Sequence, residues 1–116
     1  MSPIKDKSFK FAVKIVKLAK WLKRKSNDYE LAGQLLRSGT SVGANVTEAQ
    51  AAQSKKDFIS KMHISFKEIN ETIYWLELLA EVEIIREDIA KELLDDAKEI
   101  KKILASIIKT SKQNQG

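Results

Sequence analysis

The sequence contains no cysteine, one proline, four glycines and a single histidine. The lack of cysteine excludes disulfides, thiolate zinc sites and cysteine nucleophiles. So few prolines and glycines argue against a β-sandwich and against a disordered linker. No apolar run approaches the roughly 18 residues that cross a membrane, and residues 1–10 carry charges where a signal peptide would be apolar. We therefore predict a cytoplasmic protein with no membrane partner.

Motifs for catalysis and metal binding are also missing. A di-iron bundle needs two Glu-x-x-His pairs, whereas Ser60 stands three residues before the lone His63. The chain has no Gly-x-Ser-x-Gly nucleophile motif, and neither Gly39 nor Gly43 is followed by the Lys-Ser or Lys-Thr of a phosphate-binding loop. We predict that the protein is not an enzyme and uses no metal or cofactor.

Charge is unevenly distributed along the chain, which has a net charge of +5. Residues 1–25 hold nine basic groups and one acidic group, and residues 68–100 hold three basic and eleven acidic groups. Residues 101–116 add four lysines and no acid. A chain with segregated charges can pair with itself, with its own copies or with a polyanion.

Apolar residues recur with the helical period in four segments that are rich in helix-forming residues. We predict helices at about 8–25, 29–52, 55–82 and 87–110, with Ser8, Asp28 and Ser54 as N-terminal caps. Phe9 and Ile89 fall on the apolar sides of their helices. Short loops make neighbouring helices antiparallel. The expected fold is all-α, a single domain over 1–116 built as an antiparallel up-down-up-down four-helix bundle.

Two glycines, Gly39 and Gly43, interrupt the second predicted helix. Each costs a helix about 1 kcal/mol relative to alanine, and Asn45 with Glu48 resembles a capping box that would restart a helix after a loop. The apolar stripe nevertheless keeps its phase across the glycines, which favours one continuous helix, bent at most. Small residues at this spacing also let another helix approach closely.

A polar stripe lies beside the apolar stripe of this helix. Arg37 is one of only three arginines, and its planar guanidinium suits a fixed, bidentate partner. We predict that Arg37 pairs with Glu48 or with an acid of another helix, in a structural or interfacial network in preference to an anion-binding face. The stripe comprises Gln34, Arg37, Ser41, Asn45 and Glu48.

The third predicted helix carries apolar residues on two sides, although a helix of an isolated bundle needs only one. The second set, Ile64, Trp75 and Leu78, therefore predicts an oligomer interface. Trp21 lies among the lysines of the first helix and has the same interpretation. The alternative is that long lysine side chains cover these groups.

One face of the first helix is basic. A band of ammonium groups neutralises phosphates without reading bases, so this face predicts binding to an RNA or DNA backbone. Two alternatives stay open, a solvated face and ion pairs with acids of the fourth helix. A membrane-surface helix fits less well, because the apolar side is needed in the core. The predicted nucleic-acid contacts are Lys10, Lys14, Lys17, Lys20, Trp21 and Arg24.

Most of the chain resembles a known family, the bacterial four-helix-bundle proteins encoded in intervening sequences of large-subunit ribosomal RNA genes. The resemblance is carried by Gln34–Ala49, Ser54–Phe58, Lys67–Glu68 and Thr72–Leu76. It implies an antiparallel bundle with a continuous second helix and no established catalytic activity. These proteins are similar to the accessory protein of diversity-generating retroelements, a basic, barrel-shaped homopentamer that is thought to bind nucleic acid and its reverse transcriptase. A homopentamer, a nucleic-acid partner and a protein partner such as a reverse transcriptase are thus implied by resemblance.

The sequence supports two hypotheses of function. In the first, the protein is a non-enzymatic homo-oligomer that binds the RNA or DNA backbone through its lysine-rich helix face. In the second, it is a protein-interaction scaffold that binds no nucleic acid and uses its acidic segment and polar stripe.

Overall fold

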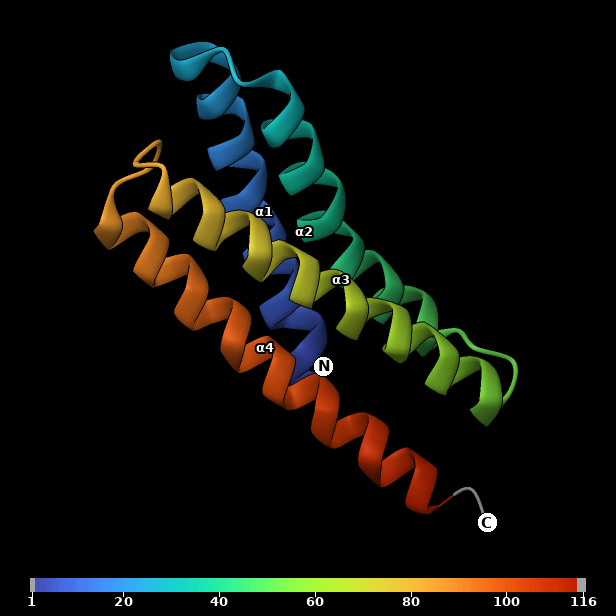
Figure 1. Cartoon of the computed structure of the whole chain (residues 1–116). Coiled ribbons are helices and arrows are strands. Elements are labelled where there is room, and N and C mark those ends of the chain that lie inside the picture. Colours follow the sequence, from blue (N-terminus) through green and yellow to red (C-terminus); the bar gives the residue numbers. More distant parts are fainter. Residues whose placement is uncertain (1, 115–116) are drawn as a thin grey trace.

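The computed structural model describes residues 2–114, and all regular secondary structure in that range is helical. Figure 1 shows consecutive helices running antiparallel, which confirms the predicted four-helix bundle. The bundle is elongated, with extents of 50 × 22 × 21 Å. Its elements are α1 (Pro3–Trp21), the π-helical turn η1 (Leu22–Ser26), α2 (Tyr29–Gln50), α3 (Lys55–Glu81) and α4 (Glu87–Gln113).

Local sequence explains where α2 and α3 begin. Asp28 accepts a hydrogen bond from the Leu31 N–H at 3.2 Å, and Ser54 Oγ accepts one from the Asp57 N–H at 3.1 Å. Both predicted caps are therefore confirmed. Asn27 precedes the first of these caps with φ 55°, a left-handed conformation that asparagine adopts more readily than most residues.

The first helix begins at Pro3, so the predicted start at Ser8 is wrong. Proline fits the first turn of a helix, where its missing N–H would have no intrahelical partner. Ser8 is instead buried within α1, and its hydroxyl donates to the Lys5 carbonyl at 3.2 Å. The extra turn buries Ile4. At the other end of the chain, α4 likewise continues beyond the predicted residue 110.

The second helix is continuous through both glycines, as the apolar phase predicted. A Cβ on Gly39 would lie 2.7 Å from Ile15 Cγ2 of α1, and a Cβ on Gly43 would lie 3.3 Å from the α1 backbone. The glycines therefore allow α1 and α2 to pack closely. The capping-box alternative is wrong, because Asn45 Nδ2 donates to the Ser41 carbonyl one turn back, at 2.8 Å.

Each helix contributes one stripe to a shared core, but two predicted members of the stripes lie outside it. Phe9 is 69% exposed and Ile89 is 38% exposed. Periodicity places both residues near the edge of an apolar face, and the packing of the neighbouring helices leaves that edge uncovered. The fully buried side chains include Phe11, Ile15, Leu22, Leu35, Val42, Met62, Ile69, Leu76, Ile100 and Leu104.

The four helices do not contact one another equally. Extensive packing joins α1 to α2, α2 to α3 and α3 to α4, whereas α1 and α4 make much less contact. In Figure 1, α1 and α4 diverge towards the end of the bundle where α4 begins. This divergence exposes the sides of α1 and α4 that carry Trp21 and Ile89.

Candidate functional site

Part of the basic face of α1 is occupied by ion pairs with α4. Lys7 Nζ lies 2.5 Å from Glu99 Oε1, and Lys14 Nζ lies 2.7 Å from Asp96 Oδ2. The hydrogen bond to Glu99 raises the pKa of Lys7 above its usual value, and the hydrogen bond to Asp96 does the same for the pKa of Lys14. The ion-pair alternative therefore holds for Lys14, a predicted phosphate contact, and for its neighbour Lys7.

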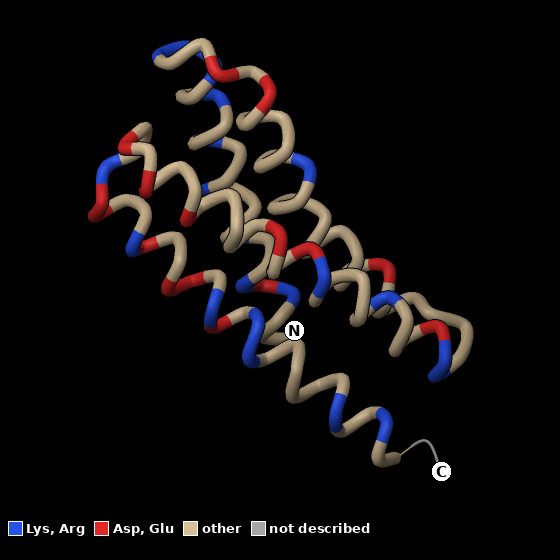
Figure 2. Tube along the Cα trace, in the orientation of Figure 1, with Lys and Arg blue, Asp and Glu red and all other residues tan. Residues whose placement is uncertain are grey.

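Several of the remaining cations of α1 and η1 are exposed. Lys10 pairs with Asp6 on its own helix at 3.1 Å. For Lys17, Lys20 and Arg24, no carboxylate within residues 2–114 lies within 4 Å of the charged nitrogens. They occupy successive helical turns, and Figure 2 shows basic residues at the C-terminal end of α1 and in η1. We call these three residues the free basic cluster.

Trp21 lies beside the free basic cluster, at the edge of a groove between α1 and α4 with a volume of about 400 Å³. Trp21 is 39% exposed, and Ile89, which lines the same groove from α4, is 38% exposed. The floor of the groove is apolar and buried. The lining residues are Lys14, Lys17, Leu18, Trp21, Ile85, Arg86, Ile89, Glu92 and Leu93.

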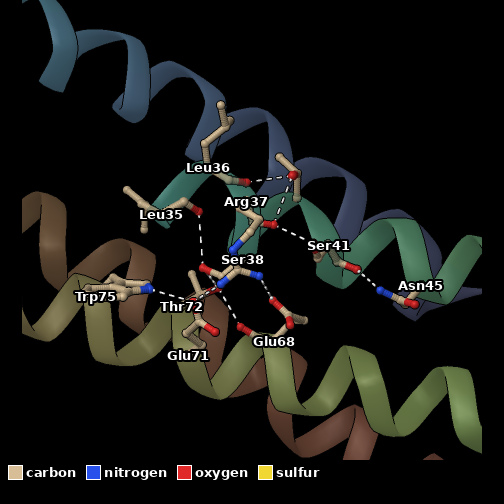
Figure 3. Close-up of polar contacts among 11 residues, drawn as sticks. Leu35, Leu36, Arg37, Ser38, Ser41, Asn45, Glu68, Glu71, Thr72 and Trp75 are labelled. Atoms are coloured by element: carbon tan, nitrogen blue, oxygen red, sulfur yellow. Dashed lines mark hydrogen bonds and ion pairs between the residues drawn. The ribbon is translucent and has the colours of Figure 1, made fainter. Parts of the chain in front are cut away.

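The polar stripe of α2 is centred on Arg37, whose guanidinium bridges two acids of α3 (Figure 3). Nη1 donates to Glu68 Oε2 at 3.0 Å, and Nη2 donates to Glu71 Oε2. The same Glu71 oxygen accepts a hydrogen bond from Trp75 Nε1 at 3.0 Å. The bond from Trp75, followed by that from Arg37, lowers the pKa of Glu71 below its ordinary range. The bond to Glu71 raises the pKa of Arg37.

The structure therefore confirms an acid of another helix as the partner of Arg37, and the alternative of pairing with Glu48 is wrong. Glu48 lies eleven positions after Arg37 on the same helix, which is about 16 Å along the axis. Glu48 lies 3.6 Å from Lys61 Nζ of α3. Gln34 is exposed, and Ser41 Oγ donates to the Arg37 carbonyl at 2.6 Å. The stripe is thus several local contacts and no single binding network.

Periodicity did not predict a buried polar seam between α2 and α3. Thr72 Oγ1 donates to Ser38 Oγ at 2.9 Å, and Ser65 Oγ donates to the Val42 carbonyl at 2.8 Å. All three hydroxyl residues are fully buried. Their positions within the apolar stripes were the available signal, because a buried hydroxyl needs a partner. The seam holds α2 and α3 in register.

The residues predicted at an oligomer interface differ in exposure. Ile64 is 39% exposed, whereas Trp75 and Leu78 are partly buried. Trp75 packs against the core and meets Tyr74 edge-on, with ring centroids 5.1 Å apart. A further exposed apolar residue, Phe9 of α1, lies beside a groove that α2 lines with small residues. Whether these surfaces contact another subunit stays a prediction.

Two further properties of residues 2–114 bear on the site. None of the helices there combines the length and the hydropathy needed to span a bilayer. Among the same residues, no three acidic or histidine side chains are grouped as metal ligands would be. The one histidine, His63, is exposed on α3.

Comparison with known proteins identifies a family and solved structures that resemble this chain. The profile of the family described as "23S rRNA-intervening sequence protein" matches residues 2–106. The crystal structure of a protein with unknown function from the S23 ribosomal protein family of Bacteroides thetaiotaomicron VPI-5482 is 51% identical to this chain. The match covers 91% of this chain and 98% of the other, with a TM-score of 0.90. No curated protein matches the sequence.

Proposed function

The chain belongs to the 23S rRNA-intervening sequence protein family, and from this premise we propose that it is a non-enzymatic, homo-oligomeric bundle that binds the backbone of RNA or DNA in the cytoplasm. The observation that carries the proposal is the free basic cluster of Lys17, Lys20 and Arg24. These side chains are exposed and have no acidic partner among the described residues. A phosphate chain can therefore approach them without breaking an existing ion pair.

The free basic cluster sets the expected strength and salt dependence of binding. Each phosphate that a cation neutralises contributes a slope of about −0.7 to −0.9 to the logarithm of affinity against the logarithm of salt. Three contacts per chain therefore predict a slope of about −2 to −3, and more where several copies engage one strand. Binding of this kind is insensitive to base sequence, because ammonium and guanidinium groups on phosphates position the ligand without reading it.

The test is fluorescence anisotropy of a labelled RNA titrated with protein at several salt concentrations. The variant Lys17→Gln/Lys20→Gln/Arg24→Gln should lose at least about 10-fold in affinity and most of the salt slope. The matched control is Lys102→Gln/Lys109→Gln/Lys112→Gln, which removes the same charge from an exposed face of α4 and should bind nearly as well as the parent. Equal losses in both variants, or binding indifferent to salt, contradict the proposal.

Assembly is the second part of the proposal, and the pentameric number is implied by resemblance alone. Exposed apolar side chains on two faces support it, Phe9 on α1 and Ile64 on α3. Burying such a side chain stabilises an interface by about 1.5–3 kcal/mol relative to exposure. Light scattering should find a species several times the chain mass of 13.2 kDa. Ile64→Lys or Phe9→Lys should reduce that mass while helicity is kept, and a parent protein of chain mass at micromolar concentration contradicts assembly.

The alternative function is a protein-interaction scaffold, with a protein partner such as a reverse transcriptase. The exposed Phe9 and its small-residue groove on α2 favour this alternative. Purification from the native cell separates the two functions. A fixed protein partner recovered without nucleic acid supports the scaffold, whereas a high ratio of absorbance at 260 nm to that at 280 nm supports nucleic-acid binding.

A further inference from the structure

The groove between α1 and α4 has one aromatic wall and an apolar floor that the bundle core does not close. Leu18, Ile85 and Leu93 form the floor and are each at most 9% exposed. Trp21 lines the same groove and is 39% exposed, although its side chain is among the largest apolar groups of the chain. The groove therefore offers a flat, partly desolvated surface to a ligand that carries an aromatic or apolar face.

The two walls of the groove differ in available charge. On the α4 wall, Arg86 is held by Asp88 through two hydrogen bonds, Nε to Oδ1 at 3.0 Å and Nη2 to Oδ2 at 2.8 Å. Glu92 on the same wall lies 3.7 Å from Lys14 Nζ. Free positive charge is thus confined to the α1 wall, where Lys17 begins the free basic cluster. The ligand that fits has an anionic edge along α1 and a flat face directed into the groove.

Single-stranded nucleic acid has this combination of an anionic backbone and unpaired base faces, whereas a duplex hides its base faces in the stack. From Lys17 to Arg24 the chain advances about 10 Å along the helix axis, enough for a few nucleotides. We propose that this groove binds single-stranded RNA or DNA, with one base stacked on Trp21 and the adjoining phosphates on Lys17, Lys20 and Arg24. The inference rests on the proposed function and adds a site and a strand preference to it.

The two tryptophans of the chain make the site directly observable. Trp75→Phe leaves Trp21 as the only indole, and Trp21→Phe leaves Trp75, which packs against the core and does not line the groove. Titration with a short single-stranded RNA of mixed sequence should quench Trp21 emission in the first variant and leave Trp75 emission unchanged in the second. Circular dichroism of each variant should match that of the parent, which shows that the remaining tryptophan reports on a folded bundle.

Affinity measurements separate stacking from charge. Trp21→Leu should lower the affinity for the single strand by about 10-fold and leave the salt slope unchanged, because stacking releases no counterions. The parent should bind the single strand at least about 5-fold more tightly than the same sequence paired with its complement, and Trp21→Leu should remove that preference.

The failures are distinguishable. Salt-dependent binding without quenching of Trp21 and without a strand preference overturns the groove while the proposed function stands. No binding to either nucleic acid at low salt overturns both. A change of Trp21 emission on dilution of the protein alone assigns the groove to a contact between copies of the chain, or between the chain and a protein segment, and overturns the inference.

Discussion

Replacing Gly39 by alanine should destabilise the bundle, even though alanine is the better helix former. The added Cβ would lie 2.7 Å from Ile15 Cγ2 and 2.9 Å from Ile15 Cγ1, well inside ordinary van der Waals contact. Ile15 is fully buried, and a β-branched side chain in a helix has one strongly preferred rotamer. The clash is therefore relieved only if α1 and α2 move apart.

The magnitude follows from two opposing terms. Alanine gains about 1 kcal/mol over glycine in a helix interior. Overpacking of a buried site typically costs about 1–3 kcal/mol, and more where neither partner can move. Ile15 is fully buried and has little freedom to move, so the cost here falls at the upper end, about 2–3 kcal/mol. The net expectation for Gly39→Ala is therefore a loss of about 1–2 kcal/mol of unfolding free energy. Gly33, on the same helix, has no atom within 4 Å of an added Cβ, so Gly33→Ala should instead gain about 0.5–1 kcal/mol.

Urea denaturation followed by circular dichroism measures both variants, at one chain concentration because the stability of an oligomer depends on it. A double-mutant cycle of Gly39→Ala with Ile15→Ala should show a favourable coupling of at least about 1 kcal/mol, since the new methyl group fills the space that the isoleucine leaves. Gly39→Ala as stable as Gly33→Ala, with no coupling to Ile15, would refute the reasoning.

Two further predictions concern charge and backbone. Glu71→Gln should cost about 1 kcal/mol at neutral pH by weakening the contact to Arg37. Because folding lowers the pKa of Glu71, this stabilisation is complete above the glutamate pKa of the unfolded chain, about 4.3, and is lost as the pH falls through the lower folded value. The parent and Glu71→Gln should therefore have the same stability in strong acid. As a control, Glu77→Gln at an exposed position should match the parent at every pH. Glu83→Gly in the α3–α4 turn should add about 0.5–1 kcal/mol to the free energy of unfolding and raise the melting temperature, because Glu83 has φ 61°. An unchanged or lower melting temperature would count against backbone strain at Glu83.

The sequence predicted the number, order and approximate ends of the helices because these depend on neighbours along the chain. Asp28 and Ser54 act as caps through bonds to N–H groups three residues ahead. The continuity of α2 followed from the phase of its apolar stripe. Ser8 misled the prediction because a serine before an apolar run looks like a cap, whereas Pro3 had already started the helix.

The candidate site was only partly predictable. The spacing of the lysines predicted the basic face of α1. It did not predict which of these lysines form ion pairs with carboxylates and which do not. Lys14 bonds to Asp96, 82 residues away in the sequence. Nothing in the spacing of the lysines distinguishes Lys14 from Lys17, which has no acidic partner within residues 2–114. That difference depends on how α4 lies against α1.

The sequence by itself therefore determined the all-α class, the four helices and the side of each helix that is apolar. Only the tertiary structure decided that Arg37 meets acids of α3, that Phe9 stays exposed and that Trp21 borders a groove. The physical reason is that the helical period gives the angle of a side chain about its own axis. It does not give the distance and crossing of two axes, which result from the packing of all four helices and determine which faces meet.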